Sequence, residues 1–215
     1  MNITRDAQDR VRFVRSLFYL NEAHSDPYWH RETAGIALPD RPATWPERNS
    51  LVHILGWTLL SNHFHLLLKE TREGGIAKFM QRLGGSMSTC FNAKYKERGS
   101  LFQGGYHGVV VDKDAHLNYL AFYIFVKNVL DMYPGGLGKA AVHFDDAWEW
   151  AKKYPFSSFS GLVSGKQSPI VEDDDGFTSN VIGKGNTFKN EAKELLLAHM
   201  ASRGEEFKEL MLESW

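Results

Sequence analysis

The chain has 215 residues, a formal net charge of −1 and an ordinary mixture of 43% hydrophobic and 24% charged residues. Its one cysteine, Cys90, excludes an intrachain disulfide and a cysteine-based zinc site. The first ten residues are polar, and the most apolar window, 51–68, is interrupted by histidine, serine and asparagine. We therefore expect no signal peptide, no membrane span and a cytoplasmic location.

Charge is distributed unevenly along the chain. Residues 61–130 carry nine Lys or Arg against five Asp or Glu, whereas residues 166–215 carry six against ten. The middle of the chain is therefore the part suited to a polyanion such as nucleic acid, although many enzymes have a similar balance.

The first 70 residues predict strands separated by loop. Residues 12–20 have the mixed alternation of a strand, and residues 21–49 hold four prolines and are predicted to be mostly loop. Residues 50–60 and 63–69 are apolar strands separated by a short polar turn. These two strands are expected to form a hairpin.

Helices dominate the rest of the chain. Apolar side chains at helical spacing predict helices over 76–97 and 114–131, and a fourth strand is expected over 101–111 between them. A shorter helix is expected near 144–153, and a C-terminal helix or pair of helices over 187–213. We expect residues 1–160 to form one domain and residues 161–215 to form a loop and helical extension.

Two histidines share one face of the strand that follows the turn. Successive side chains of a strand alternate between its faces, so His63 and His65 project together while Phe64 points the other way. Two imidazoles at this spacing can bind one divalent metal ion. The same pattern also fits hydrogen-bonded histidines on a solvated strand face.

The helix predicted over 114–131 carries candidate partners for such a metal ion. Tyr123 and Lys127 are four residues apart and share a helical face, whereas Asn128 lies well round the helix from Tyr123. A tyrosine near a metal-polarised phosphate can act as a covalent nucleophile. An aromatic stripe that only packs in the core explains the same residues.

The motifs, taken in order, resemble the single-tyrosine HUH transposases of the IS200-like superfamily, especially its REP-associated branch. The similarity covers roughly residues 10–160 and rests on four segments, which are 61-SNHFHLLLKE-70, 75-GIAKFMQRLGGSMSTCFNAKYKERGSLFQGGYHGVVVD-112, 117-LNYLAFYIFVKN-128 and 153-KYPFSSF-159.

This resemblance implies an α+β fold, in which helices pack on an antiparallel, ferredoxin-like sheet, followed by a C-terminal helical extension. It places the metal-binding HUH pair at His63 and His65 and the nucleophile at Tyr123. Such enzymes use Mg²⁺ or Mn²⁺ to cut single-stranded or hairpin DNA, form a 5′-phosphotyrosine, leave a free 3′-OH and rejoin strands by reversal. Members of the family occur as monomers or homodimers.

One position departs from the family pattern. The family has an amide four residues after the tyrosine as a third metal ligand, and this chain has Lys127 there. A protonated lysine cannot bind a metal ion. Either a local bulge brings Asn128 round to the metal, which is the interpretation we favour, or another oxygen serves, or the chain has lost activity.

Other residues are candidate DNA contacts. Gln103 resembles a family position near the site, and Lys127 can either contact the scissile phosphate or lie on the outer face of the helix. Lys94, Lys96 and Arg98 precede Gln103 and can meet phosphates, although a solvated helix end explains them equally well.

Three functions are consistent with these observations. The first is a metal-dependent transposase that nicks single-stranded DNA. The second is a catalytically inactive, domesticated protein that binds hairpin DNA, which Lys127 favours. The third is a metal-dependent hydrolase in which Tyr123 only packs in the core. Replacement of Tyr123 by phenylalanine separates the three.

Overall fold

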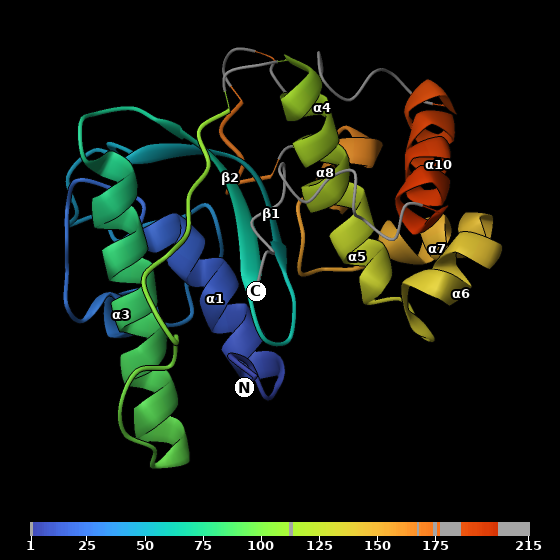
Figure 1. Ribbon diagram of the computed structural model, residues 1–215. Helices are drawn as coiled ribbons and strands as arrows, with labels where there is room; N and C mark the ends of the chain where they lie inside the picture. The colour runs from blue at the N-terminus through green and yellow to red at the C-terminus, as the bar shows by residue number, and fades with distance from the viewer. Residues whose placement is uncertain (1, 112–113, 167, 174–175, 177–185, 202–215) are drawn as a thin grey trace.

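A two-stranded antiparallel hairpin lies between two groups of helices (Figure 1). The structure is a computed structural model that describes residues 2–111, 114–166, 168–173, 176 and 186–201. Much of the polar segment 164–186 and the last part of the C-terminal helix predicted over 187–213 lie outside these residues.

Strands β1 (Val52–Leu59) and β2 (Phe64–Glu70) form the predicted hairpin. Their register pairs Thr58 with His65, and it is interrupted by an irregularity between Ile54 and Gly56. The backbone N–H of Leu60 donates to the carbonyl of His63 and closes the turn. The two strands predicted over 50–60 and 63–69 are confirmed.

Helix α1 (Ala7–Tyr19) occupies the segment in which we expected a strand over 12–20, so that prediction is wrong. Asp6 and Asp9 form a capping box that starts the helix. Phe13 and Leu17 are four residues apart and fully buried, which is the spacing of one helix face. The aromatic and β-branched residues of this segment therefore pack from a helix, because burial outweighs intrinsic strand preference.

The first helical group packs α1 and α3 (Gly75–Tyr95) against one face of the hairpin, with the short α2 (Trp29–Glu32) nearby. The buried side chains of β1 on this face include Ile54, Trp57 and Leu59. Figure 1 shows α1 and α3 on the same side of β1 and β2. The helix predicted over 76–97 is confirmed as α3.

Residues 101–111 contain no strand, contrary to our prediction. Residues 103–110 are exposed, and three of them are glycines, which lose much entropy when ordered and offer no side chain to pack. In Figure 1 this segment runs as a strap between α3 and α4.

One continuous helical segment, 114–131, forms the second group's central element, here called the tyrosine helix. It consists of α4 (Asp114–Phe122), a π-helical turn (Tyr123–Lys127) and α5 (Asn128–Asp131). All residues from 119 to 130 are buried, which is typical of a helix packed on every side. The predicted helix is confirmed, with a π turn at its centre.

The remaining helices pack around the tyrosine helix. They are α6 (Gly136–Val142), α7 (Phe144–Ala151), α8 (Phe159–Ser164) and α10 (Asn186–Ala201). Leu55 and Leu67 of the hairpin belong to the same hydrophobic cluster as these helices. The hairpin is thus covered on both faces.

Close approach of the tyrosine helix to β1 depends on Gly56. A Cβ atom at Gly56 would lie 2.0 Å from Cε1 of Phe125, a fully buried ring in the π turn. Thr58, two residues on, donates a hydrogen bond from its hydroxyl to the carbonyl of Ile124. The π turn is therefore tied to the hairpin by packing and by a buried hydrogen bond.

The other edge of β1 is also paired. Thr58 forms an isolated antiparallel bridge with Ser157, and the N–H of Ser158 donates to the carbonyl of Trp57. The 153–159 motif thus packs back on the hairpin. The α+β fold class, with helices on an antiparallel sheet and a C-terminal helical region, is confirmed. None of the described helices is long and apolar enough to cross a membrane.

Candidate functional site

The two histidines of the hairpin lie together at the mouth of a cleft. Their ring centroids are 4.9 Å apart with the rings nearly perpendicular, and His65 is buried while His63 is partly exposed. Nδ1 of His63 is 2.8 Å from Oδ1 of Asn62. When Nδ1 carries the hydrogen of this bond, Nε2 keeps the lone pair that a metal ion requires.

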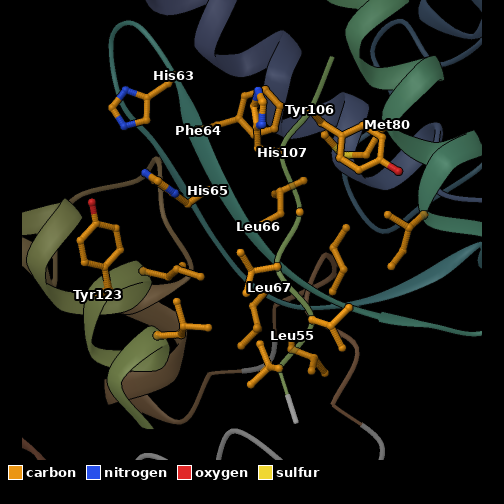
Figure 2. A pocket seen from close by; sticks show the side chains of 18 of the residues that line it. Leu55, His63, Phe64, His65, Leu66, Leu67, Met80, Tyr106, His107 and Tyr123 are labelled. Atoms are coloured by element: carbon orange, nitrogen blue, oxygen red, sulfur yellow. The ribbon is translucent and has the colours of Figure 1, made fainter. Parts of the chain in front are cut away.

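The strand register brings the tyrosine helix to these histidines. The ring of Tyr123 lies edge-on to the ring of His65, with centroids 5.5 Å apart, and Tyr123 is 3% exposed. Figure 2 shows His63, His65 and Tyr123 grouped on one side of the cleft, whereas Tyr106, His107 and Met80 lie on the other. The predicted pair and the predicted nucleophile are thus neighbours in the fold.

A π turn separates Tyr123 from Asn128. The backbone N–H of Asn128 donates to the carbonyl of Tyr123, five residues earlier, where an α-helix would use residue 127. Asn128 therefore bonds the carbonyl that the fourth residue after Tyr123 would bond in an α-helix. This is the local bulge that the third-ligand hypothesis requires.

The side chain of Asn128 is fully buried, and neither Oδ1 nor Nδ2 has a hydrogen-bond partner in the described part of the chain. A buried amide without partners is costly, and such groups call for an explanation such as an absent ion or water. Asn128 is not among the residues that line the cleft. Its amide is therefore buried and is not part of the surface of the cleft.

Lys127 lies on the cleft side of the same turn. Its Nζ is 4.8 Å from the centroid of the Tyr123 ring and 2.9 Å from Oδ2 of Asp131. The side chain is nearly buried and lines the cleft. A positive charge therefore lies directly over the candidate nucleophile, partly balanced by one carboxylate.

The cleft has a volume of about 1790 Å³, larger than the roughly 300–1,000 Å³ of a typical small-molecule site. Its walls come from β2, the strap 102–111 and the tyrosine helix. Gln103 and the half-exposed Tyr106 line it. The shape and the aromatic lining suit an extended, unstacked chain of nucleotides more than a compact metabolite.

Not all predicted DNA contacts lie at this cleft. Gln103 and Lys127 line it, whereas Lys94, Lys96 and Arg98 do not. Lys94 donates to Asp6 (2.6 Å) and to Asp9 (2.8 Å) of the α1 capping box.

Hydrogen bonds to Asp6 and then to Asp9 raise the pKa of Lys94. Lys94 thereby links α3 to the N-terminus of α1 through two ion pairs. Two carboxylates already neutralise the charge of Lys94 and would repel a phosphate beside it, whereas no ion pair with a carboxylate is seen for Lys96 or Arg98 among the described residues, and both are exposed.

Sequence reasoning missed two residues of the site. Thr58 pairs with His65 across the hairpin and binds the π turn. His199 of α10 hydrogen-bonds Tyr119 and contacts Tyr123. His199 follows the helical spacing of the buried Ala192 and Leu196, and this spacing was the available signal.

The residues present fit a divalent metal ion in part. Among the described residues, no three His, Cys, Asp or Glu side chains are grouped so that they could hold a metal ion. His63 and His65 contribute two imidazoles, and the amide of Asn128, without a partner among the described residues, offers an oxygen. A third protein ligand would therefore be an amide, with phosphate and water oxygens completing the shell.

Comparison with known proteins gives one match. The family model described as "Transposase IS200 like" matches residues 47–126. This segment contains His63, His65 and Tyr123 and ends just before Lys127 and Asn128. Neither the search of curated proteins nor the search of solved structures found a match.

Proposed function

Since residues 47–126 carry an IS200-like transposase domain, we propose that this chain cleaves and rejoins single-stranded, hairpin-associated DNA with Tyr123 as its nucleophile. The observation that carries the proposal is the contact of Tyr123 with His65, whose ring in turn contacts His63, because two segments far apart in sequence meet at one cleft. Assignment to the REP-associated branch, a monomeric or homodimeric state and a cytoplasmic location stay predictions.

The proposed step is a balanced transfer of a phosphoryl group. The phenolic oxygen of Tyr123 attacks the scissile phosphorus, a P–O bond to tyrosine forms and the P–O3′ bond breaks. The phenol loses its proton to solvent, and the departing 3′ oxygen takes one up. Attack by another 3′-OH reverses the step and rejoins the strand, so no external energy source is consumed.

His63 and His65 would hold Mg²⁺ or Mn²⁺, and we propose Asn128 as their third partner. When bound, such an ion polarises a phosphate and balances its developing charge. The support from this chain is the buried amide of Asn128, which follows the π turn and has no hydrogen-bond partner among the described residues. The protein's own part is to fix the imidazoles and the phenol in one place.

Lys127 and Gln103 are the proposed DNA contacts within the cleft. The ammonium of Lys127 lies beside the reacting phenol and is suited to a nonbridging oxygen of the scissile phosphate. Lys96 and Arg98 are exposed and would meet phosphates further along the strand. Lys94 is the weakest of the predicted contacts, because two carboxylates already bind it.

Two observations favour a second function. Asn128 does not line the cleft, and Lys127 stands at the sequence position where the resemblance implies an amide. A domesticated protein that holds hairpin DNA without cutting it would have the same cleft and the same positive charge. Such a protein would bind DNA and form no covalent adduct.

The test is a covalent-adduct assay. Labelled single-stranded DNA from the flanks of the protein's own gene is incubated with Mn²⁺ or Mg²⁺, and the products are separated on a denaturing gel. We expect a metal-dependent shifted band that is lost in Tyr123→Phe. Tyr106→Phe, which alters another tyrosine of the same cleft, is the matched control and should keep the band.

Two other outcomes of this assay would support the alternative functions. Tight DNA binding without an adduct would support the non-cutting protein. Cleavage that continues in Tyr123→Phe, with no adduct in either protein, would support a hydrolase that uses the histidine pair and water.

A further inference from the structure

The C-terminal helix α10 packs against the core that surrounds the tyrosine helix. Phe188, Ala192 and Leu196 recur at four-residue spacing and are buried in the same hydrophobic cluster as the tyrosine helix. Phe188 contacts the ring of Trp148 with centroids 5.8 Å apart. Lys189 forms an ion pair with Asp145 at 2.6 Å. Helix α10 therefore has a defined position beside α7.

His199 extends the buried face of α10 toward the nucleophile. It lies three residues after Leu196, so the two share a face of the helix, and it is only 9% exposed. Its Nδ1 is 3.3 Å from the hydroxyl of Tyr119. Its ring centroid is 6.5 Å from that of Tyr123.

Tyr123 is thus enclosed by rings on two sides. His65 contacts it from β2 at 5.5 Å, Tyr119 from the preceding turn of the same helix at 6.3 Å, and His199 from α10 at 6.5 Å. Tyr119 lies one helical turn before Tyr123, where a ring can restrict the rotation of the next. The hydrogen bond between Tyr119 and His199 fixes that restricting ring.

We propose that His199 is a positioning residue for Tyr123, so that the C-terminal helix completes the catalytic centre. His199 holds Tyr119 by its hydrogen bond, and the two rings together hold the phenol of Tyr123 toward the histidine pair. The inference rests on the proposed function of Tyr123 as nucleophile. Precise placement is worth much in such a reaction, because a shift of about 1 Å can cost about 10²-fold in rate.

The first arm of the test measures rate and affinity separately in the full chain. His199→Leu removes the hydrogen bond and keeps an apolar side chain, whereas His199→Asn can still place a polar atom near the hydroxyl of Tyr119. We expect His199→Leu to lower the single-turnover rate of adduct formation by roughly tenfold or more, with the Kd for hairpin DNA unchanged within about twofold. His199→Asn should recover most of the rate.

The matched control is Met200→Ala, which changes the next residue of α10, 40% exposed. It should leave rate and affinity unchanged. The inference is overturned if His199→Leu keeps the full rate, if His199→Asn loses as much as His199→Leu, or if Met200→Ala has the same effect.

The second arm does not depend on activity. Full-length protein carrying ¹³C-labelled tyrosine rings is examined by NMR, with the signals of Tyr119 and Tyr123 assigned from their Phe variants. His199→Leu should shift both signals, and His199→Asn should return the Tyr123 signal toward its original position. Unshifted signals in His199→Leu overturn the inference, whatever the rates.

The two arms distinguish a failure of this inference from a failure of the proposed function. If wild-type protein forms no adduct on DNA that it binds, the proposed function fails while the NMR spectra still decide whether His199 positions Tyr123. If the adduct forms and the tyrosine signals do not respond to His199, the proposed function stands and this inference falls.

Discussion

The backbone N–H of Asn128 bonds the carbonyl of Tyr123, so the chain inserts one residue into the helix that carries the candidate nucleophile. With this insertion Lys127 lies over the Tyr123 ring, and the next residue, Asn128, has a buried amide without a hydrogen-bond partner among the described residues. Single π turns of this kind are frequent at functional sites. Two features of the sequence, an unexpected lysine and a displaced asparagine, thus have one structural cause.

The state of the Asn128 amide predicts an unusual pair of effects. Asn128→Leu replaces an unpartnered buried amide by an apolar group of similar size, so we expect the metal-free protein to be stabilised by about 1 kcal/mol. The same change should weaken the dependence of adduct formation on Mn²⁺. Chemical denaturation in a chelator and a Mn²⁺ titration measure the two effects.

Asn21→Leu is the control for this prediction. Asn21 is equally buried, but its amide donates to the carbonyl of Val52 at 2.8 Å and accepts from the N–H of Val52 at 3.0 Å. Asn21→Leu should therefore lower the free energy of unfolding by about 3 kcal/mol. Destabilisation of Asn128→Leu with an unaltered Mn²⁺ response would mean that the Asn128 amide is purely structural.

The histidine pair predicts a metal-dependent gain in stability. A ligand that binds only the folded state stabilises it by about 2.7 kcal/mol at one hundred times its Kd. Saturating Mn²⁺ should therefore raise the Tm of the wild type and leave the Tm of the His63→Ala, His65→Ala double variant unchanged. His53→Ala, a histidine of β1 that lies 3.9 Å from Glu172, should respond like the wild type. Equal responses from all three proteins would refute the site.

Packing of the π turn on β1 predicts a strong effect at Gly56. In Gly56→Ala the new methyl group would overlap the ring of Phe125, so we expect a loss of about 1–3 kcal/mol in the free energy of unfolding. Gly85→Ala in α3 meets no atom within 4 Å and should instead stabilise the protein by up to about 1 kcal/mol. Thermal and chemical unfolding compare the two variants, and equal behaviour would contradict the close packing of Phe125 on Gly56.

The link between α1 and α3 predicts an acid-sensitive contribution to stability. Burial opposes the charge of Asp9, but hydrogen bonds from Lys94, the backbone of Arg5 and Tyr95 lower the pKa of its carboxyl below the ordinary 3.8. Because the folded pKa is the lower one, the contribution is complete above about pH 5 and is lost as pH falls below about 4.

Asp9→Asn tests that assignment. At pH 7 the variant should be less stable than the wild type by about 2 kcal/mol, and the difference should shrink as pH falls below about 4. Denaturant unfolding at pH 7 and pH 3 measures it. A difference of the same size at both pH values would show that the carboxylate charge is not the cause.

The hairpin and the tyrosine helix could be predicted because their signals are local. His63 and His65 alternate with the apolar Phe64 and Leu66, and residues 119–126 are all apolar or aromatic, so strand and helix follow from spacing. The meeting of Tyr123 with His65 was implied by the family resemblance. The roles of Thr58 and His199 beside these residues depend on tertiary packing, which no local pattern reveals.

Two segments differ from their predicted structure, each for its own physical reason. Residues 12–20 contain strand-favouring aromatics, but the capping box at Asp6 and Asp9 starts a helix and burial sustains it. Residues 101–111 were predicted to form a strand because of their valines, yet no strand among the described residues pairs with them. A strand requires a partner, which no single segment can specify.

The most direct measurement is the identity of the residue that DNA becomes attached to. After incubation with Mn²⁺ and single-stranded flank DNA, the protein is digested and the nucleotide-bearing peptide is sequenced by mass spectrometry. We predict a nucleotide joined through its 5′-phosphate to Tyr123. Attachment at any other residue, or cleaved DNA with no attached peptide, would contradict the account.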